Sequence, residues 1–333
     1  MFFALTDEQV ALEQTVRDYL GDRFALDKVR EVFEDPTGDG HPPELWKALG
    51  EQGWLAVTVP EEHDGLGLGM VDAQVLARAF GAWTTPGPWR GTVLATEAIR
   101  LAGTPEQQAE WLPKLGAGEA VGAVALDNRW IEYGNVADVL VSEQDGGLVL
   151  STRDGFDAEV VEQLDLTTRL SRVTVRNSTP LLGGAAAAAE LRDRASLLAA
   201  ADLAGIARET VDRTAAYDTD RLQFGKPVGS FQAIKHHLAD LHIAAAMSIH
   251  AVLYAAHALD AGLPDASAAV SVAKAKASDT AVATTGAMIQ YFGGIGFTWE
   301  HEAHFYFKRA KRLARTHGDG AQHRERLAAA LVG

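Results

Sequence analysis

Two loops decide the fold of this chain: Arg221-Leu-Gln-Phe-Gly-Lys-Pro-Val-Gly-Ser-Phe-Gln232 and Gln290-Tyr-Phe-Gly-Gly-Ile-Gly-Phe-Thr298. They interrupt a C-terminal region with alanine-rich, amphipathic composition that is typical of long helices. The expected helices cover residues 185–216, 230–261, 266–291 and 301–331. We expect Ser230 to cap the second helix and Gly262 to end it. Four long helices with short connections predict an antiparallel bundle.

The chain before the bundle divides into a helical part and a β part. Thr6-Asp-Glu-Gln9 predicts a capping box, and helices are expected at Pro43–Gly50, at 71–82 and after Thr104. Short β-type runs follow at residues 121–126, 136–142, 147–152 and 168–175, and they predict a small antiparallel sheet. The expected fold class is therefore α+β and mostly α. We expect an N-terminal helical domain at 1–120, a reduced central β domain at 121–180 and a C-terminal helical bundle at 181–333.

Composition excludes several kinds of function. The chain of 333 residues has no cysteine, so disulfides, thiolate metal sites, iron–sulfur clusters and cysteine nucleophiles are absent. Its formal net charge of −15 argues against nucleic-acid binding, which needs a basic face. The basic run Lys308–Arg315 is an exception within the acidic chain. It is either a solvated helix face or a surface that meets an anion or a partner.

Other patterns favour a cytoplasmic protein without a metal. The N-terminus lacks a basic region followed by a long apolar run, which argues against a secretory signal. We expect no membrane span, because uncharged apolar runs are too short. His236, His237 and His242 are interpreted as an exposed or interface helix face, since adjacent histidines point to different sides of a helix and no carboxylate–histidine array accompanies them.

A third segment completes a specific pattern. It begins with Gly53-Trp-Leu and ends with Val59-Pro-Glu-Glu-His-Asp-Gly-Leu-Gly-Leu68. In this order and spacing, the three segments resemble the acyl-CoA dehydrogenase family over nearly the whole chain. The resemblance implies an FAD enzyme that removes two hydrogens from Cα and Cβ of an acyl-CoA thioester. It also implies a helical domain, a β domain and a four-helix bundle whose loops reach the ADP part of FAD on a neighbouring subunit.

The family's ADP contacts can be carried over to individual residues of the two bundle loops. They correspond to Arg221, Gln223, Phe224, Gln232, Gln290, Gly293 and Gly294. A fixed guanidinium suits a pyrophosphate, and glycines allow the backbone to approach an anion closely. The alternative interpretation is an ordinary helix connection whose glycines only end helices.

Contacts with the flavin ring are not recognisable in the sequence. Family members carry a Thr-Glu-Pro-x-x-Gly-Ser-type segment and then a Trp-Ile-Thr/Ser strand in the β domain, whereas this chain has Ala123-Val-Ala-Leu-Asp-Asn-Arg-Trp-Ile-Glu132 in that region. We interpret Trp130 and Ile131 as a packing pair.

Three residues are candidates for the catalytic base. The family's glutamate in a Tyr-Glu-Gly-Thr pattern corresponds to His317, and Asp319 follows it closely. Some family members place the base on the first bundle helix, where this chain has Asp202 in an apolar run. Asp202 either contacts substrate or pairs with a cation of the bundle.

The chain keeps the residues that contact the ADP part of FAD but not the motifs that contact the flavin ring. In this combination it resembles the short subunit of heteromeric α2β2 acyl-CoA dehydrogenases of actinobacterial steroid catabolism. The resemblance implies a longer acyl-CoA dehydrogenase subunit as partner, with a homodimer as the alternative, and electron-transfer flavoprotein as electron acceptor. Substrates would be acyl-CoA esters, including steroid-derived ones. Two alternatives remain open: a flavin-dependent monooxygenase or oxidase on the same fold, and a structural subunit without catalytic residues.

Overall fold

The computed structural model describes residues 4–126 and 130–332. Its contacts divide the chain into two compact units, which are described separately. Unit 1 contains the described residues up to Leu26, Gln74–Thr85 and the chain from Ser196 onward; unit 2 contains Asp27–Ala73 and Pro86–Ala195. The chain division at residues 120 and 180 stays a prediction.

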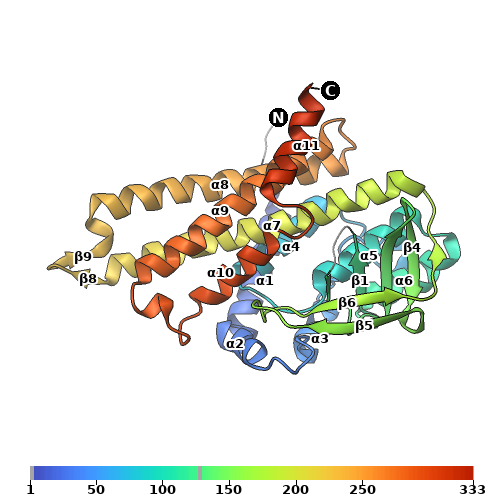
Figure 1. The fold of residues 1–333 in the computed structure, drawn as a ribbon, viewed down its shortest axis with the longest axis horizontal. Coiled ribbons are helices and arrows are strands. Elements are labelled where there is room, and N and C mark those ends of the chain that lie inside the picture. The colour runs from blue at the N-terminus through green and yellow to red at the C-terminus, as the bar shows by residue number, and fades with distance from the viewer. Residues whose placement is uncertain (1–3, 127–129, 333) are drawn as a thin grey trace. The chain divides into compact units, whose positions relative to one another are not determined.

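Unit 1 is built mainly from long helices (Figure 1). Helix α9 packs against α8, α10 and α11. Buried alanines recur every four residues along α9, at Ala269, Ala273, Ala277 and Ala281, and their small side chains allow neighbouring helices to approach closely. The helices of the unit are α1 (Asp7–Arg23), most of α4 (Met70–Ala82), most of α7 (Gly184–Asp220), α8 (Gln232–Asp260), α9 (Ala266–Phe292), α10 (Ala303–Leu313) and α11 (Gly320–Val332).

Within unit 1, segments that are far apart in sequence contact α7. A Cβ atom added at Gly81 of α4 would lie 2.1 Å from the carbonyl oxygen of Asp202, so the backbones of α4 and α7 almost touch. Helix α1 also contacts α7, since Arg17 donates to Glu209 at 2.7 Å. These contacts place the N-terminal helix and the end of α4 with the bundle.

Two expectations for the bundle were wrong in detail. The expected last helix at 301–331 is two helices, α10 and α11, because His317 and Gly318 adopt positive φ angles of 57° and 95°. Ser230 does not cap α8. Its hydroxyl donates to Pro227 O at 2.7 Å within the short 3₁₀ turn Val228–Ser230, and α8 begins two residues later at Gln232.

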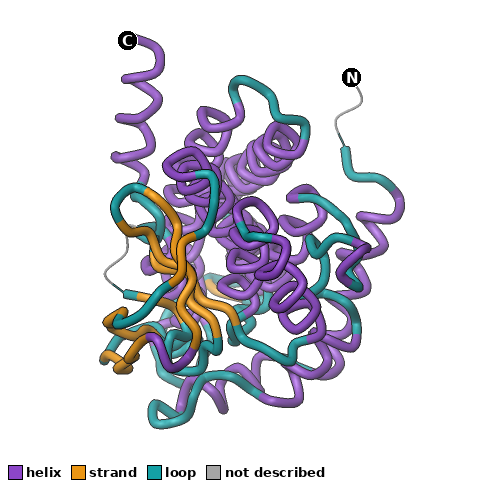
Figure 2. The backbone as a smooth tube through the Cα atoms, turned by 90° about the vertical axis from the view of Figure 1, so that its right-hand side faces the viewer, coloured by secondary structure: helices purple, strands orange, loops and turns teal. Residues whose placement is uncertain are grey.

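Unit 2 combines helices with two small sheets (Figure 2). A buried cluster contains residues of both sheets, among them Ala123, Ile131, Leu140 and Phe156. Helix α5 packs against β1 and β3. The helices are most of α2 (Leu26–Glu34), α3 (Pro43–Glu51), α5 (Trp89–Ala102) and α6 (Pro105–Ala117); the strands are β1 (Gly122–Ala125), β2 (Ile131–Glu132), β3 (Val139–Gln144), β4 (Gly147–Thr152), β5 (Phe156–Val161), β6 (Leu170–Val175) and β7 (Thr179–Pro180).

The prediction of an all-antiparallel β unit was partly wrong. The first sheet has the order β1-β3-β4-β7 and the second β2-β6-β5. Strands β3 and β4 pair antiparallel through a tight turn, as expected, but β1 and β3 are parallel, with Gly122 opposite Val139. Parallel strands are not joined by a hairpin, and β2, which lies between β1 and β3 in the sequence, belongs to the other sheet.

Local signals predicted several elements well. The capping box at Thr6 is confirmed, because its hydroxyl accepts from the backbone N–H of Gln9 and the Gln9 side chain bonds back. The helix start at Thr104 is confirmed too, and the structure adds a capping box of the same kind with Gln107. The sequence patterns missed α2, α5 and β5. By length and composition alone, α8 is apolar enough to cross a membrane; one such helix is weak evidence, because core helices of soluble proteins meet the same criteria.

Candidate functional site

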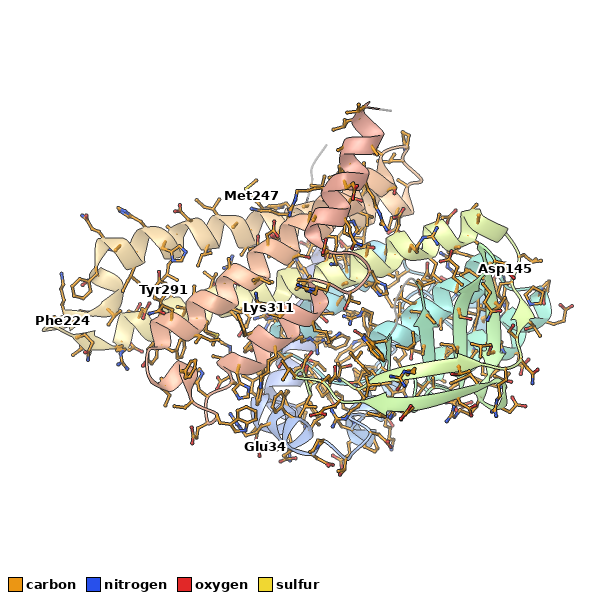
Figure 3. The ribbon with its side chains drawn as sticks, viewed as in Figure 1. Glu34, Asp145, Phe224, Met247, Tyr291 and Lys311 are labelled. Atoms are coloured by element: carbon orange, nitrogen blue, oxygen red, sulfur yellow. The ribbon has the colours of Figure 1, made fainter. Side chains whose placement is uncertain are left out.

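The hairpin after α7 exposes one candidate residue at its tip. Strands β8 (Leu222–Gln223) and β9 (Lys226–Pro227) are joined by Phe224 and Gly225, whose φ angles of 54° and 78° are those of a type I′ turn. A phenylalanine is costly in this left-handed conformation. Its side chain is 92% exposed and lies at the end of the unit (Figure 3). The aromatic ring is therefore accessible to a ligand or another chain.

The loops at residues 221–232 and 290–298 meet at Arg221 and Gly293. A Cβ atom added at Gly293 would lie 3.8 Å from Arg221 Nη2. Gly293 has φ 66° and ψ −138°, a conformation that is essentially reserved for glycine. The guanidinium therefore lies directly beside exposed backbone of the second loop.

Tyr217 and Phe292 hold this arrangement in place. Arg221 Nη1 donates to the Tyr217 hydroxyl, one helical turn back on α7. The Tyr217 ring stacks on Phe292 with centroids 4.1 Å apart and planes 9° apart. Phe292 directly precedes Gly293, so this stack ties both loops together. Sequence reasoning missed both aromatic residues, although an aromatic residue four positions before an arginine on a helix was a usable signal.

Asp218 is a second residue that sequence reasoning missed. It is fully buried, and neither carboxylate oxygen has a hydrogen-bond partner among the described residues. Burial raises its pKa from 3.8 to about 6, while the charge of Arg221 opposes the shift. The nearby Tyr291 hydroxyl has a raised pKa because of burial and the Asp218 charge, and it bonds to His237 Nδ1 at 2.5 Å.

The other positions of the predicted ADP site lie on exposed parts of the same loops. Gln290 accepts from Gly293 N–H at 3.2 Å through its carbonyl, and Gly294 follows. Gln223 lies beside Phe224 in the hairpin, and Gln232 is the first residue of α8. The structure thus brings together Arg221, Gly293 and Gln290, and it places Gln232 at the exposed start of α8.

These residues fit the ADP part of FAD chemically. Arg221 supplies a fixed cation for a pyrophosphate, and Gly293 leaves space that a side chain would fill. Exposed glutamine amides and the Phe224 ring suit a ribose and an adenine.

The segment 123–132, which stands where family members carry their flavin-ring motifs, has packing contacts in its described residues. Ile131 is buried in the core cluster of unit 2, and the Trp130 ring lies 5.5 Å from the Arg172 guanidinium carbon. The interpretation as a packing pair agrees with these contacts. Residues 127–129 of that segment lie outside the described residues.

Asp202 is paired with a cation of the bundle. Its carboxylate accepts from Arg309 Nε at 3.1 Å and from Arg309 Nη2 at 2.6 Å, and both side chains are buried. Arg309 also donates to Thr85 O at 3.0 Å. The sequence left two interpretations of Asp202 open, a substrate contact and an ion pair with a bundle cation, and the structure contains the ion pair.

The other two base candidates lie in the turn between α10 and α11. Asp319 caps α11, because its carboxylate accepts from the N–H groups of Ala321 and Gln322 at 3.0 and 2.9 Å. These bonds, led by that of Gln322, lower the pKa of Asp319. His317 is half-buried and has the positive φ angle noted above. Its backbone carbonyl accepts from Ser196 Oγ and from His323 Nε2.

Residues of the basic run have structural contacts, whereas His236, His237 and His242 on α8 are exposed. Within Lys308–Arg315, Arg309 is the buried partner of Asp202, and Lys308 Nζ lies 4.2 Å from the centroid of the Trp299 ring. The run is therefore not a uniformly solvated face. Among the residues that the structure describes, no group of three or more histidine or acidic side chains is arranged to hold a metal ion.

Comparison with known proteins gives the family. The model of the acyl-CoA dehydrogenase N-terminal domain matches residues 6–119, and that of the C-terminal domain matches residues 183–332. The chain is 36% identical to acyl-CoA dehydrogenase IpdE2 of Mycobacterium tuberculosis, with 91% of each protein covered. It is 35% identical to IpdE2 of Mycolicibacterium smegmatis, covering 98% of this chain and 99% of that protein.

A solved structure agrees with this result. The Tcur3481–Tcur3483 steroid acyl-CoA dehydrogenase, in its G363A variant, superposes with a TM-score of 0.88 at 26% identity over 98% of both chains. The fold class expected from the sequence is confirmed. The chain belongs to the acyl-CoA dehydrogenase family, whose cofactor is FAD.

Proposed function

We propose that the chain is a subunit of an FAD-dependent acyl-CoA dehydrogenase that acts on steroid-derived CoA esters. Its part is to contribute contacts to the ADP end of an FAD seated mainly in a longer partner subunit. The convergence of Arg221 and Gly293, held by Tyr217 and Phe292, carries this proposal. The steroid substrate class is supported by the likeness to a structure described as a steroid acyl-CoA dehydrogenase.

The chemistry of the family assigns a role to His317. FAD, when bound, supplies the hydride acceptor for the hydrogen on Cβ. The hydrogen on Cα leaves as a proton, and its bonding electrons form the Cα=Cβ bond. The proton acceptor must lie beside the flavin ring, so this chain supplies it only where the substrate reaches the chain's own cleft. For that arrangement we assign His317, since a neutral imidazole is a base near neutral pH. Asp202 and Asp319 are engaged in an ion pair and a helix cap.

The same proposal names the partners. The exposed Phe224 ring and the adjoining loops fit an interface with a second flavoprotein subunit in an α2β2 assembly; a homodimer is the competing arrangement. Electron-transfer flavoprotein is the proposed electron acceptor, and the cytoplasm the proposed location.

Flavin counting tests the ADP contacts and the partner. The chain is expressed alone and together with a longer acyl-CoA dehydrogenase from the same genome, and FAD per chain is measured by absorbance and protein assay. We expect Arg221→Ala to raise the Kd of the complex for FAD by about tenfold or more, the effect of losing a charged hydrogen bond, and so to lower the FAD content after dilution and gel filtration. Arg208→Ala is the control, because Arg208 lies on α7 but pairs with Asp212 on an exposed face. Full flavin content in Arg221→Ala would contradict the ADP contact.

Activity separates the remaining possibilities. If the single chain carries a full complement of flavin and dehydrogenates acyl-CoA, the obligate partner is wrong. Oxygen consumption by the reduced complex in place of transfer to electron-transfer flavoprotein would indicate the monooxygenase or oxidase. An unchanged rate in His317→Ala would indicate a structural subunit.

A further inference from the structure

The turn between α10 and α11 is held by a buried lysine. Lys274 on α9 is fully buried, and its ammonium group donates to Gly318 O at 2.8 Å, to Ala314 O at 3.3 Å and to Ser278 Oγ at 3.2 Å. Two of these acceptors are backbone carbonyls at the two ends of the turn. A buried ammonium is stable only where several acceptors replace its water, so this geometry is demanding.

A buried histidine bonds to the same turn from another helix. His323 on α11 is fully buried, with Nε2 3.0 Å from His317 O and Nδ1 3.2 Å from Ser271 Oγ. A carbonyl can only accept, so Nε2 carries the hydrogen. Burial, assisted by the Lys274 charge, lowers the pKa of His323 to about 4, so the ring is neutral at pH 7 and its Nδ1 accepts from Ser271.

A third helix completes the set. Ser196 on α7 is buried and its hydroxyl donates to His317 O at 3.3 Å. Donors from α7, α9 and α11 therefore converge on the carbonyl groups of Ala314, His317 and Gly318. The backbone of His317 is left-handed, a conformation that is uncommon for a residue with a side chain.

We propose that Lys274, His323 and Ser196 form a polar clamp that fixes the backbone of residues 314–318 and thereby positions the His317 side chain for proton transfer. The clamp residues are positioning residues, since they act on the reaction through their bonds to this backbone. The catalytic half of this inference rests on the proposed role of His317. The structural half does not.

Hydrogen exchange tests the structural half without any activity. In the FAD-loaded complex, Lys274→Met keeps the length of the side chain and removes its donors. We expect exchange of the amides of residues 314–319 to accelerate by about tenfold or more, the effect of losing hydrogen bonds from a charged donor. Lys276→Met, two residues later on α9 and with a half-exposed side chain, is the matched control and should leave that exchange unchanged. Unchanged exchange in Lys274→Met overturns the clamp.

A second pair of variants covers the case in which Lys274→Met does not fold. His323→Leu removes the donor to His317 O, whereas His323→Gln can place an amide N–H near the former Nε2. We expect accelerated exchange in the first and restoration in the second. Equal exchange in both variants also overturns the clamp.

The catalytic half is read from kcat, KM and the pH profile of the complex. We expect His323→Leu to lower kcat by about tenfold, with KM for acyl-CoA and FAD content little changed and with partial rescue by His323→Gln. Unchanged kcat despite faster exchange, in an enzyme whose rate falls in His317→Ala, overturns positioning. If His317→Ala is itself fully active, the proposed role of His317 in proton transfer is wrong. The hydrogen-exchange rates of residues 314–319 then still test whether the clamp fixes this backbone.

Discussion

Breaking the ion pair between Asp202 and Arg309 should be among the most destabilising single changes in unit 1. The two side chains are only 5% and 7% exposed, and two hydrogen bonds join them. Arg309→Met would leave the carboxylate buried without this partner, which costs about 3–5 kcal/mol. Loss of the bond from Arg309 to Thr85 O adds about 1 kcal/mol. We therefore expect the free energy of unfolding to fall by about 4 kcal/mol or more.

The assay is equilibrium unfolding in urea at neutral pH, with an exposed ion pair as the control. Arg324 and Asp279 are 2.8 Å apart but 56% and 63% exposed, so Arg324→Met should cost less than about 1 kcal/mol. Adding Asp202→Leu to Arg309→Met should recover much of the loss, because the double variant removes both charges of this pair. An Arg309→Met variant as stable as Arg324→Met would refute the reasoning.

Three further predictions concern other features. The pKa of Asp218 is raised from 3.8 to about 6 in the folded state. Ionisation of this carboxyl therefore destabilises the folded state increasingly between about pH 4 and pH 6, and by a constant amount at higher pH. Asp218→Asn should therefore raise the unfolding free energy by about 1–3 kcal/mol at pH 7 and by much less at pH 4 in urea titrations; equal gains at both would contradict this explanation. Gly81→Ala should lower the melting temperature, because its Cβ would lie 2.1 Å from the Asp202 carbonyl, whereas Gly286→Ala, with no atom within 4 Å, should maintain or raise it; matching shifts would argue against close backbone contact. Thr104→Ala should cost about 1 kcal/mol by removing the cap of α6, and Thr104→Asp should not; a cost shared by both would exclude capping as the cause.

Local features of the fold were predictable from the sequence, and long-range ones were not. A capping box such as Thr104 with Gln107 is encoded within four residues, so it could be predicted directly. The parallel pairing of β1 with β3 depends on where the intervening chain crosses, and the β-type composition of each strand carries no direction. The end of α10 was missed although glycine, here Gly318, is a common helix terminator. The donors that bond to the His317 and Gly318 carbonyls come from three helices, and local sequence does not show them.

The candidate site divides in the same way. The motifs identified Arg221 and Gly293, but the contact between them needs the Tyr217–Phe292 stack, which joins residues 75 positions apart. The apolar surroundings of Asp202 in the sequence indicated a buried carboxylate, which needs a cation as partner unless it has a role at the active site. They could not select Arg309, which is 107 residues away.

The contact of α1 with α7 also implies a delay in folding during synthesis in the cell. Arg17 and Glu209 are separated by 192 residues. At a synthesis rate of about 5–20 residues per second, α1 leaves the ribosome roughly 10–40 seconds before the helix that it packs against. During that interval Arg17 lacks its partner Glu209, and Val16 and Leu20, which are completely buried in the finished protein, lie on a helix that has not yet met α7. Helix α1 thus gains its contact with α7 long after its own synthesis, and until then chaperones or the acidic residues of the helix would keep it out of aggregates.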